Sequence, residues 1–264
     1  MKKSIRFISL FLAVITALGV FLPLGFADKQ PGAFSFEIIS GKAVIGGYSG
    51  TESNLVIPER VKDERTGDYC DVTSVRFIDF NDEAVFASIS FPKTVREIVF
   101  DRDIICEEYI VDGESPVYLS DDGVLFTKDM AVLVRYPCLS GRKTYTVPAD
   151  VIIVESEAFK NSVNLEKVSF EGLVRRIGFE AFSGCKNLKS VENLPAGFDT
   201  VGADAFEGCE SLVSSTGFVL SEFGGFKDFI TAKKNEAHGI GNVLASILNK
   251  FFGSKNKAGG KNKK

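Results

Sequence analysis

The hydrophobic positions between residues 151 and 214 recur with a long, nearly fixed period. Three successive segments each carry an Ala-Phe pair, spaced 23 and then 24 residues apart: Ala158-Phe159, Ala181-Phe182 and Ala205-Phe206. Two more apolar columns keep step with these pairs: Val154, Ile177 and Val201, then Leu165, Leu188 and Leu212. Such a period is typical of a solenoid, in which one supersecondary unit stacks on copies of itself. We therefore expect the phenylalanines and leucines to form continuous interior columns.

Each repeat predicts a short strand followed by a tight turn. Leu188–Leu194 alternates in polarity and is expected to lie beside its counterparts, Leu165–Phe170 and Leu212–Ser215. Ile177, Ala181 and Phe182 have a spacing that a helical or 3₁₀ turn would direct inward. The expected fold class is therefore α/β and strand-rich, with a parallel strand ladder along the solenoid.

The chain before the repeats also predicts strands. Residues 28–100 contain apolar runs separated by glycine-rich turns, which predict a strand-rich N-terminal cap followed by degenerate repeats: Phe34–Ile39, Ala43–Ile45 and Leu55–Ile57. Residues 101–148 carry three more β-rich runs: Val117–Leu119, Val124–Thr127 and Val132–Tyr136. Asp122-Gly123 separates the first two, and this dipeptide favours the positive φ of a tight hairpin turn. We expect a β-hairpin segment here.

The N-terminus has the layout of a secretory signal peptide. Three basic residues lie within Met1–Arg6, an uncharged apolar stretch runs from Phe7 to Phe26, and small residues precede a cleavage site near Ala27. We interpret residues 1–27 as a signal peptide and the mature protein as secreted or exposed on the cell surface. An uncleaved membrane anchor is the alternative.

The C-terminal segment, residues 221–264, predicts an amphipathic helix and a basic tail. Seven apolar residues between Ile240 and Phe252 follow a helical spacing, and Ser254–Lys264 is a Gly/Lys/Asn run that is not expected to fold. The helix has two interpretations, which the sequence leaves open. It caps the open end of the solenoid, or it lies with its lysines on an anionic membrane surface.

The repeat motif resembles a known family. The second copy reads Ile177-Gly178, Ala181-Phe182, Gly184-Cys185, Leu188, Val191 and Leu194-Pro195, and the third repeats it from Val201-Gly202 to Leu212. This pattern is similar to the BspA-like, or Treponema pallidum-type, leucine-rich repeats of bacterial surface proteins. The first copy departs from it, with Glu155-Ser156 and Asn161-Ser162 in place of Ile-Gly and Gly-Cys. The resemblance implies a leucine-rich-repeat solenoid over residues 149–220 and a role in adhesion, and it brings no catalytic residues.

Enzymatic chemistry has little support in this sequence. Its one histidine, His238, lies in the basic tail, so Ser-His-Asp, Cys-His and histidine-containing zinc sites lack a base or a ligand. We expect no catalytic residues, no metal and no cofactor. Cys185 and Cys209 occupy the same phase of successive repeats, which favours small buried residues over a disulfide or metal pair between coils. Adjacent acidic pairs, Glu107-Glu108 and Asp121-Asp122, are interpreted as solvated turn residues.

The charge distribution limits the partners. The net charge is −4, but Lys233–Lys264 holds eight lysines and one acidic residue, so the remainder of the mature chain is strongly acidic. An acidic body argues against nucleic-acid binding, because phosphate contacts need Lys and Arg. Only Ile240–Lys264 is a candidate for contact with an anionic membrane.

The expected function is a non-catalytic module that binds a protein or glycan partner, such as a host or neighbouring-cell surface. The candidate ligand-facing residues are polar positions on the expected strand face: Glu166, Lys167, Lys189, Ser190 and Glu192. Two alternatives remain open. One is a carboxylate-dependent hydrolase of surface polymers, which needs two acidic residues across a cleft. The other is an envelope scaffold that acts through its C-terminal helix.

Overall fold

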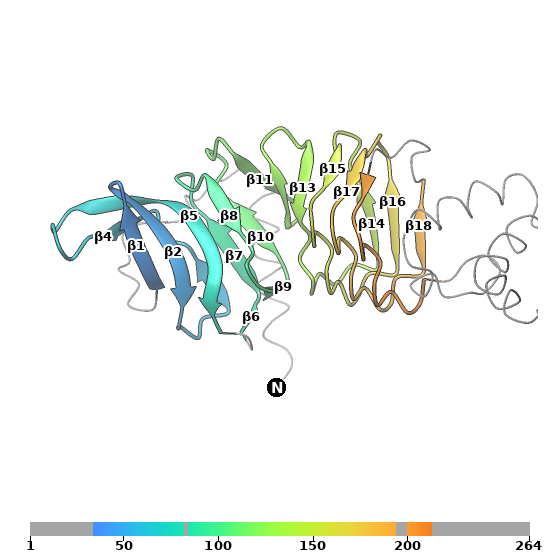
Figure 1. Ribbon diagram of the computed structural model, residues 1–264, viewed down its shortest axis with the longest axis horizontal. Helices are drawn as coiled ribbons and strands as arrows, with labels where there is room; N and C mark the ends of the chain where they lie inside the picture. The colour runs from blue at the N-terminus through green and yellow to red at the C-terminus, as the bar shows by residue number, and fades with distance from the viewer. Residues whose placement is uncertain (1–33, 82–83, 194–199, 213–264) are drawn as a thin grey trace, which may run out of the picture.

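The computed structural model is an elongated stack of short strands (Figure 1). It describes residues 34–81, 84–193 and 200–212. The expected signal peptide at 1–27 and the expected helix and tail at 221–264 lie outside the described residues. In Figure 1 the N-terminal strands form one end of the molecule, and the coils of the repeat region follow side by side along its long axis.

The N-terminal half contains three small sheets. The largest has the order β1-β2-β5-β4, with β8 also paired to β5; its strands are β1 (Phe34–Ile39), β2 (Lys42–Tyr48), β4 (Arg60–Lys62), β5 (Tyr69–Phe80) and β8 (Glu97–Val99). A parallel sheet follows, in the order β10-β7-β3, from β3 (Asn54–Val56), β7 (Ser88–Phe91) and β10 (Tyr109–Val111). The third sheet pairs β6 (Val85–Phe86) with β9 (Ile105–Cys106).

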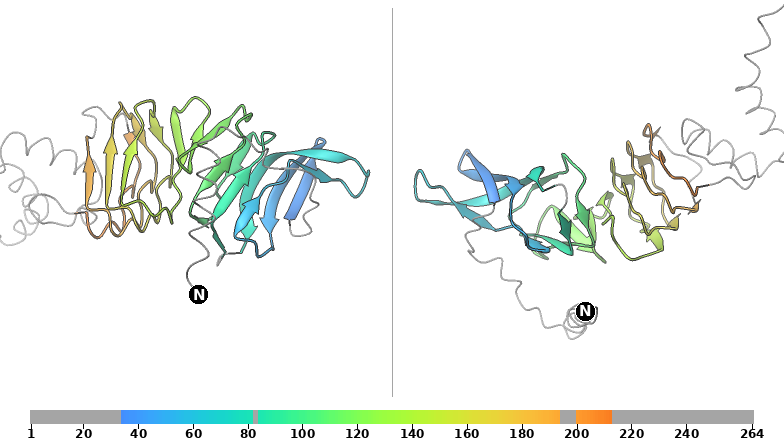
Figure 2. Two further views of the ribbon diagram at one scale, coloured as in Figure 1. Left: turned by 180° about the vertical axis from the view of Figure 1, so that it is seen from behind. Right: turned by 90° about the horizontal axis from the view of Figure 1, so that it is seen from below.

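The repeat region contains two ladders. One has the order β11-β12-β13-β15-β17-β19, with bounds β11 (Tyr118–Asp121), β12 (Val124–Thr127), β13 (Val132–Arg135), β15 (Ile153–Val154), β17 (Arg176–Ile177) and β19 (Thr200–Val201). The other has the order β14-β16-β18 and is parallel, from β14 (Thr144–Val147), β16 (Lys167–Phe170) and β18 (Ser190–Glu192). Figure 2 shows these coils from behind and from below. The predicted pairing of the second and first repeat strands is confirmed, since Lys167 lies opposite Ser190; the third counterpart extends past residue 212, beyond the described range.

The hairpin strands belong to the first ladder. β11 and β12 pair antiparallel around Asp122 and Gly123, whose φ values are 51° and 77°. β12 and β13 also pair antiparallel, and β13 then pairs parallel with β15. The three strands of this segment therefore continue directly into the repeat ladder.

The helical part of the α/β expectation is wrong for the described residues, which contain strands and turns but no helix. Ile177–Phe182 shows the reason. The amides of Glu180 and Phe182 donate to the carbonyls of Ala203 and Ala205 in the next coil, at 3.1 and 2.7 Å. Because these amides bond across coils, they cannot form the i→i−4 bonds of an α-helix. Glu180, with φ at 50°, also interrupts any helical run.

Stacked aromatic rings run through the repeat core. Tyr136 stacks on Phe159, Phe159 on Phe182 and Phe182 on Phe206, with ring centroids 5.0, 4.6 and 4.9 Å apart. All four rings are buried. The expected phenylalanine column is therefore present, and Tyr136 extends it by one position that the Ala-Phe pattern does not reveal.

Two hydrophobic cores meet at β12. Val124 and Phe126 belong to the core of the repeats, while Leu125 between them belongs to the core of the N-terminal half. Alternate side chains of a strand point to opposite faces, so this one strand contributes to both cores. β12 and its neighbours therefore join the two halves of the molecule.

Candidate functional site

The structure places the five predicted ligand-facing residues together on the β14-β16-β18 ladder. Lys167 and Ser190 lie opposite each other on β16 and β18, and Glu192 lies opposite Ser169. Glu166 and Lys189 immediately precede these strands. Val168 and Val191, which alternate with Lys167, Ser190 and Glu192 along the strands, are buried, so the strand period turns these three polar side chains outward. Glu166 and Lys189 are not placed by that alternation, but their side chains also reach solvent at the start of the strands. We call the surface formed by all five residues the outer strand face.

Ion pairs link the charges of the outer strand face from coil to coil. Glu166 contacts Lys143 at 2.9 Å and Lys189 at 2.6 Å, so one carboxylate is shared by two lysines. The hydrogen bonds from Lys189 and Lys143 lower the pKa of Glu166 to about 2. Lys167 and Glu192 form a second pair at 2.6 Å. The face thus presents a regular array of alternating charges.

Hydroxyl groups fill the positions between these charges. Thr146 and Ser169 lie opposite each other, with their Oγ atoms 3.0 Å apart. Both side chains are short, and each hydroxyl can donate one hydrogen bond and accept others. The outer strand face can therefore offer donors and acceptors in rows whose spacing the parallel ladder fixes.

Lys143 also belongs to this face, although the three Ala-Phe repeats do not include it. It lies one repeat before Glu166, just ahead of β14, and its side chain is 75% exposed. Lys143 lies 23 residues before Glu166, which is one repeat period, so the same period predicts its position.

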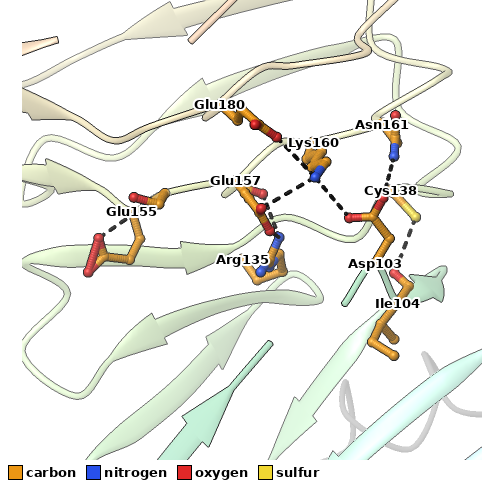
Figure 3. Close-up of polar contacts among 10 residues, drawn as sticks. Asp103, Ile104, Arg135, Cys138, Glu155, Glu157, Lys160, Asn161 and Glu180 are labelled. Atoms are coloured by element: carbon orange, nitrogen blue, oxygen red, sulfur yellow. Dashed lines mark hydrogen bonds and ion pairs between the residues drawn. The ribbon is translucent and has the colours of Figure 1, made fainter. Parts of the chain in front are cut away.

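A second polar cluster lies where the N-terminal half meets the first repeats (Figure 3). The Nζ atom of Lys160 contacts Glu180 at 3.0 Å, and Asp103 and Glu157 at 3.3 Å each. Although burial alone would lower the pKa of Lys160, the hydrogen bond to Glu180 and the charges of Asp103 and Glu157 raise it above its ordinary value. This cluster, which the sequence analysis did not identify, connects three separate segments of the chain.

Arg135 extends the same cluster. Its guanidinium lies 4.2 Å from the centre of the Phe100 ring and donates a 2.7 Å hydrogen bond to the carbonyl of Glu157. Its side chain is only 12% exposed. A largely buried charge with these contacts acts mainly in positioning the two halves, because little of it remains available to an external ligand.

Cys185 and Cys209, which are equivalent in successive repeats, both lie in the core. Cys185 and Cys209 are buried free thiols, and they donate to the carbonyls of Phe159 and Phe182 at 3.0 and 3.1 Å. Burial raises the pKa of Cys185 well above its ordinary value. Each thiol therefore bonds the preceding coil, in agreement with the interpretation as small buried residues.

Two features are absent from the described ranges. Between residues 34 and 212, leaving out the two internal gaps, no three His, Cys, Asp or Glu side chains gather as metal ligands would. No helix in that part of the chain is both long and apolar enough to span a membrane.

Comparison with solved structures finds leucine-rich repeat proteins of bacteria. The pneumococcal vaccine antigen PcpA has 13% identity over 71% of this chain and 80% of its own, with a TM-score of 0.42. A leucine-rich repeat protein of Bacteroides ovatus has 19% identity over 71% of this chain and 52% of its own, with a TM-score of 0.44. The leucine-rich repeat protein of T. pallidum has 17% identity over 71% and 80%, with a TM-score of 0.32.

No curated protein matches the chain. A family model does: residues 141–218 match the BspA type leucine-rich repeat region, in six copies. The matched range contains β14 to β19 and thus the whole outer strand face. Residues 141–218 are therefore similar to BspA-type leucine-rich repeats, and the rest of the chain lies outside the match.

Proposed function

We propose that this protein is an exported, non-catalytic binding module that recognises a protein or glycan partner through the outer strand face. The contact residues are Glu166, Lys167, Lys189, Ser190 and Glu192, together with Lys143. The observation that carries the proposal is the array of alternating charges and hydroxyls that three parallel strands hold in fixed register.

The physical support is preorganisation. Backbone hydrogen bonds between coils fix the strands that carry these side chains before a ligand arrives, so binding costs little ordering of the main chain. The charges are already paired with one another, which favours a partner whose own charges are complementary to the pattern over a partner of one uniform charge. Export is supported by the signal-peptide pattern of residues 1–27.

Arrays of extracellular proteins and of glycans, probed with the labelled chain, test this function. A double charge swap, Lys167→Glu with Glu192→Lys, keeps the ion pair but reverses the pattern that a partner meets. We expect the swap to weaken binding to the captured partner at least about tenfold, or 1.4 kcal/mol, with an unchanged melting temperature.

A matched control exists in the N-terminal half. Lys93 and Glu114 form an exposed pair at 2.6 Å that lies outside the repeat region. The swap Lys93→Glu with Glu114→Lys should leave binding unchanged. Equal losses in both double variants, or no loss in the Lys167/Glu192 variant, would show that the outer strand face is not the binding surface.

Export has its own measurement. Mass spectrometry of chain recovered from the culture medium or the cell surface should give an N-terminus at Asp28. Retention of Met1–Ala27 in the mature chain would instead support the membrane-anchor alternative.

A further inference from the structure

β14 is the edge strand of the outer ladder. It pairs with β16 on one side, and no other strand in the described part of the chain pairs with it. On the paired side, the amides of Lys167 and Glu171 donate to the carbonyls of Lys143 and Val147, at 3.0 and 3.2 Å. In a parallel ladder this register directs the Tyr145 and Val147 amides toward β16 as well. The amides and carbonyls of Thr144 and Thr146 therefore point away from β16.

This edge is accessible. Thr144 and Thr146 are both exposed, whereas Lys167 and Ser169, opposite them on β16, are only partly so. The parallel β10-β7-β3 sheet also has an edge strand, β10, but the outward backbone amides of β10 already have partners. The Tyr109 amide donates to the Gly123 carbonyl at 2.9 Å, and the Val111 amide donates to the Ser120 hydroxyl at 3.0 Å. β14 has no such bonds among the described residues.

We propose that the free edge of β14 receives an extended segment of a partner protein, which adds as a fourth strand to the β14-β16-β18 ladder. The carbonyls of that segment accept from the Thr144 and Thr146 amides, and its own amides donate to the carbonyls of the same two residues. Strand addition of this kind derives affinity from main-chain hydrogen bonds and selectivity from side chains at alternate positions. This inference rests on the proposed binding function and names its mode.

The charge pattern identifies the chemistry of the segment. Along the row Lys143, Glu166, Lys189 the charges alternate, and Lys143 is 75% exposed although it shares Glu166 with Lys189. An acidic residue on the incoming strand, beside Lys143, continues the alternation. β14 itself, Thr144–Val147, carries no acidic residue, so a second copy added in either direction would offer Lys143 no opposite charge. A copy added in the same direction would place Lys143 beside Lys143, and like charges directly opposite are destabilising. The occupant is therefore an acidic extended peptide.

A peptide derived from β16 is a suitable probe. The probe is a synthetic peptide with the sequence of Leu165–Glu171, capped at both ends. Within the folded chain the same segment pairs with the other side of β14, in a register that places Glu166 opposite Lys143. Its binding to the purified chain can be measured by fluorescence anisotropy. The same peptide with Glu166→Lys serves as the charge control, and we expect it to bind at least about tenfold more weakly.

Variants of β14 test the main-chain bonds. Thr146→Pro removes one outward amide but none of the bonds to β16, and proline is tolerated at a strand edge whose amide faces solvent. Thr146→Val is its matched control, because it also removes the hydroxyl contact with Ser169 but keeps the amide. We expect Thr146→Pro to weaken peptide binding at least about tenfold relative to Thr146→Val. Lys143→Glu should reverse the preference between the two peptides.

The stability of these variants checks the register independently. The Ser169 amide faces β14 and takes part in the hydrogen bonds of the ladder. Ser169→Pro removes this amide, so it should lower the melting temperature much more than Thr146→Pro does. Equal destabilisation by the two prolines would overturn the proposal, as would no binding of the Glu166-containing peptide or equal binding by Thr146→Pro and Thr146→Val. A dimer in sedimentation experiments that Thr146→Pro abolishes would assign the edge to a second copy instead.

These results remain distinguishable from failure of the proposed function. Loss of partner binding in the Lys167/Glu192 swap but not in Thr146→Pro supports the outer strand face and overturns the strand-addition mode.

Discussion

The rings of Phe159 and Phe182 stack 4.6 Å apart with an interplanar angle of 8°. The two residues lie 23 positions apart in the sequence, so the ring spacing is the rise of one coil. This value is close to the 4.7–4.9 Å separation of neighbouring β-strands. Aromatic stacking and the strand ladders therefore share one repeat distance, and neither distorts the other.

Truncating a ring in this column should destabilise the protein strongly. Phe182 is fully buried between Phe159 and Phe206, so Phe182→Ala removes two stacked contacts and leaves a cavity. We expect a loss of about 3–5 kcal/mol in the free energy of unfolding, measured by urea titration. Phe179→Ala is the control: this ring is 44% exposed, and its removal should cost less than about 1 kcal/mol. Equal costs would contradict the packed column.

A methyl group at Gly178 should force neighbouring coils apart. A Cβ atom there would lie 2.3 Å from the Ser156 nitrogen and 2.6 Å from the Glu155 carbonyl carbon. Because both atoms are backbone, the clash cannot be relieved by a side-chain rotation. Gly178→Ala should cost about 1–3 kcal/mol in thermal or urea unfolding. Gly141→Ala, where a Cβ meets nothing within 4 Å, should change stability by less than about 0.5 kcal/mol.

The shared carboxylate should make stability depend on acidic pH. Glu166 has a pKa of about 2 in the folded chain, below its ordinary value of 4.5. A depressed carboxylate pKa contributes stability that is complete above the ordinary value and is lost as the pH falls toward the folded value. The stability advantage of wild type over Glu166→Gln should therefore shrink as the pH drops from 4.5 and vanish below about 2.

Carbon-13 NMR titration of the Glu166 carboxyl gives the direct measurement. Lys189→Met should raise its pKa toward 4.5, because the hydrogen bond from Lys189 is the largest cause of the shift. Lys186→Met serves as the control, since Lys186 is exposed and lies outside this pair network. A normal pKa for Glu166 in wild type would refute the shared ion pair.

Removing Lys160 should loosen the junction between the two halves. Lys160→Met leaves Asp103, Glu157 and Glu180 close together without their common cation. We expect a loss of about 1–3 kcal/mol at neutral pH, measured by urea unfolding. Lys160→Arg, which keeps a cation among the three carboxylates, should recover most of this loss. Equal losses for methionine and arginine would show that the charge of Lys160 does not supply the stability.

The sequence by itself determined the repeat architecture. The columns at Phe159, Phe182 and Phe206 and the pairing of β16 with β18 follow from the 23- and 24-residue periods, because stacking identical units brings equivalent positions together. Strand alternation predicted the outward positions of Lys167, Ser190 and Glu192, and the repeat period brought Glu166 beside Lys189 just ahead of the strands. Local pattern and fold agree at the apolar columns, where each side chain packs against its own equivalent in the next coil.

The tertiary structure decided the conformation of the turns in each coil and every contact between unlike segments. The turns at Glu180 and Phe182 are not helical because their amides donate to carbonyls of the next coil. The spacing of apolar residues does not reveal which carbonyl an amide will bond. Asp103 meets Lys160 only because β12 and β13 join the two halves and bring the N-terminal half against the first repeats. The free edge of β14 likewise exists because no described strand pairs with that side. Contacts between unlike segments depend on the path of the whole chain, which no local period encodes.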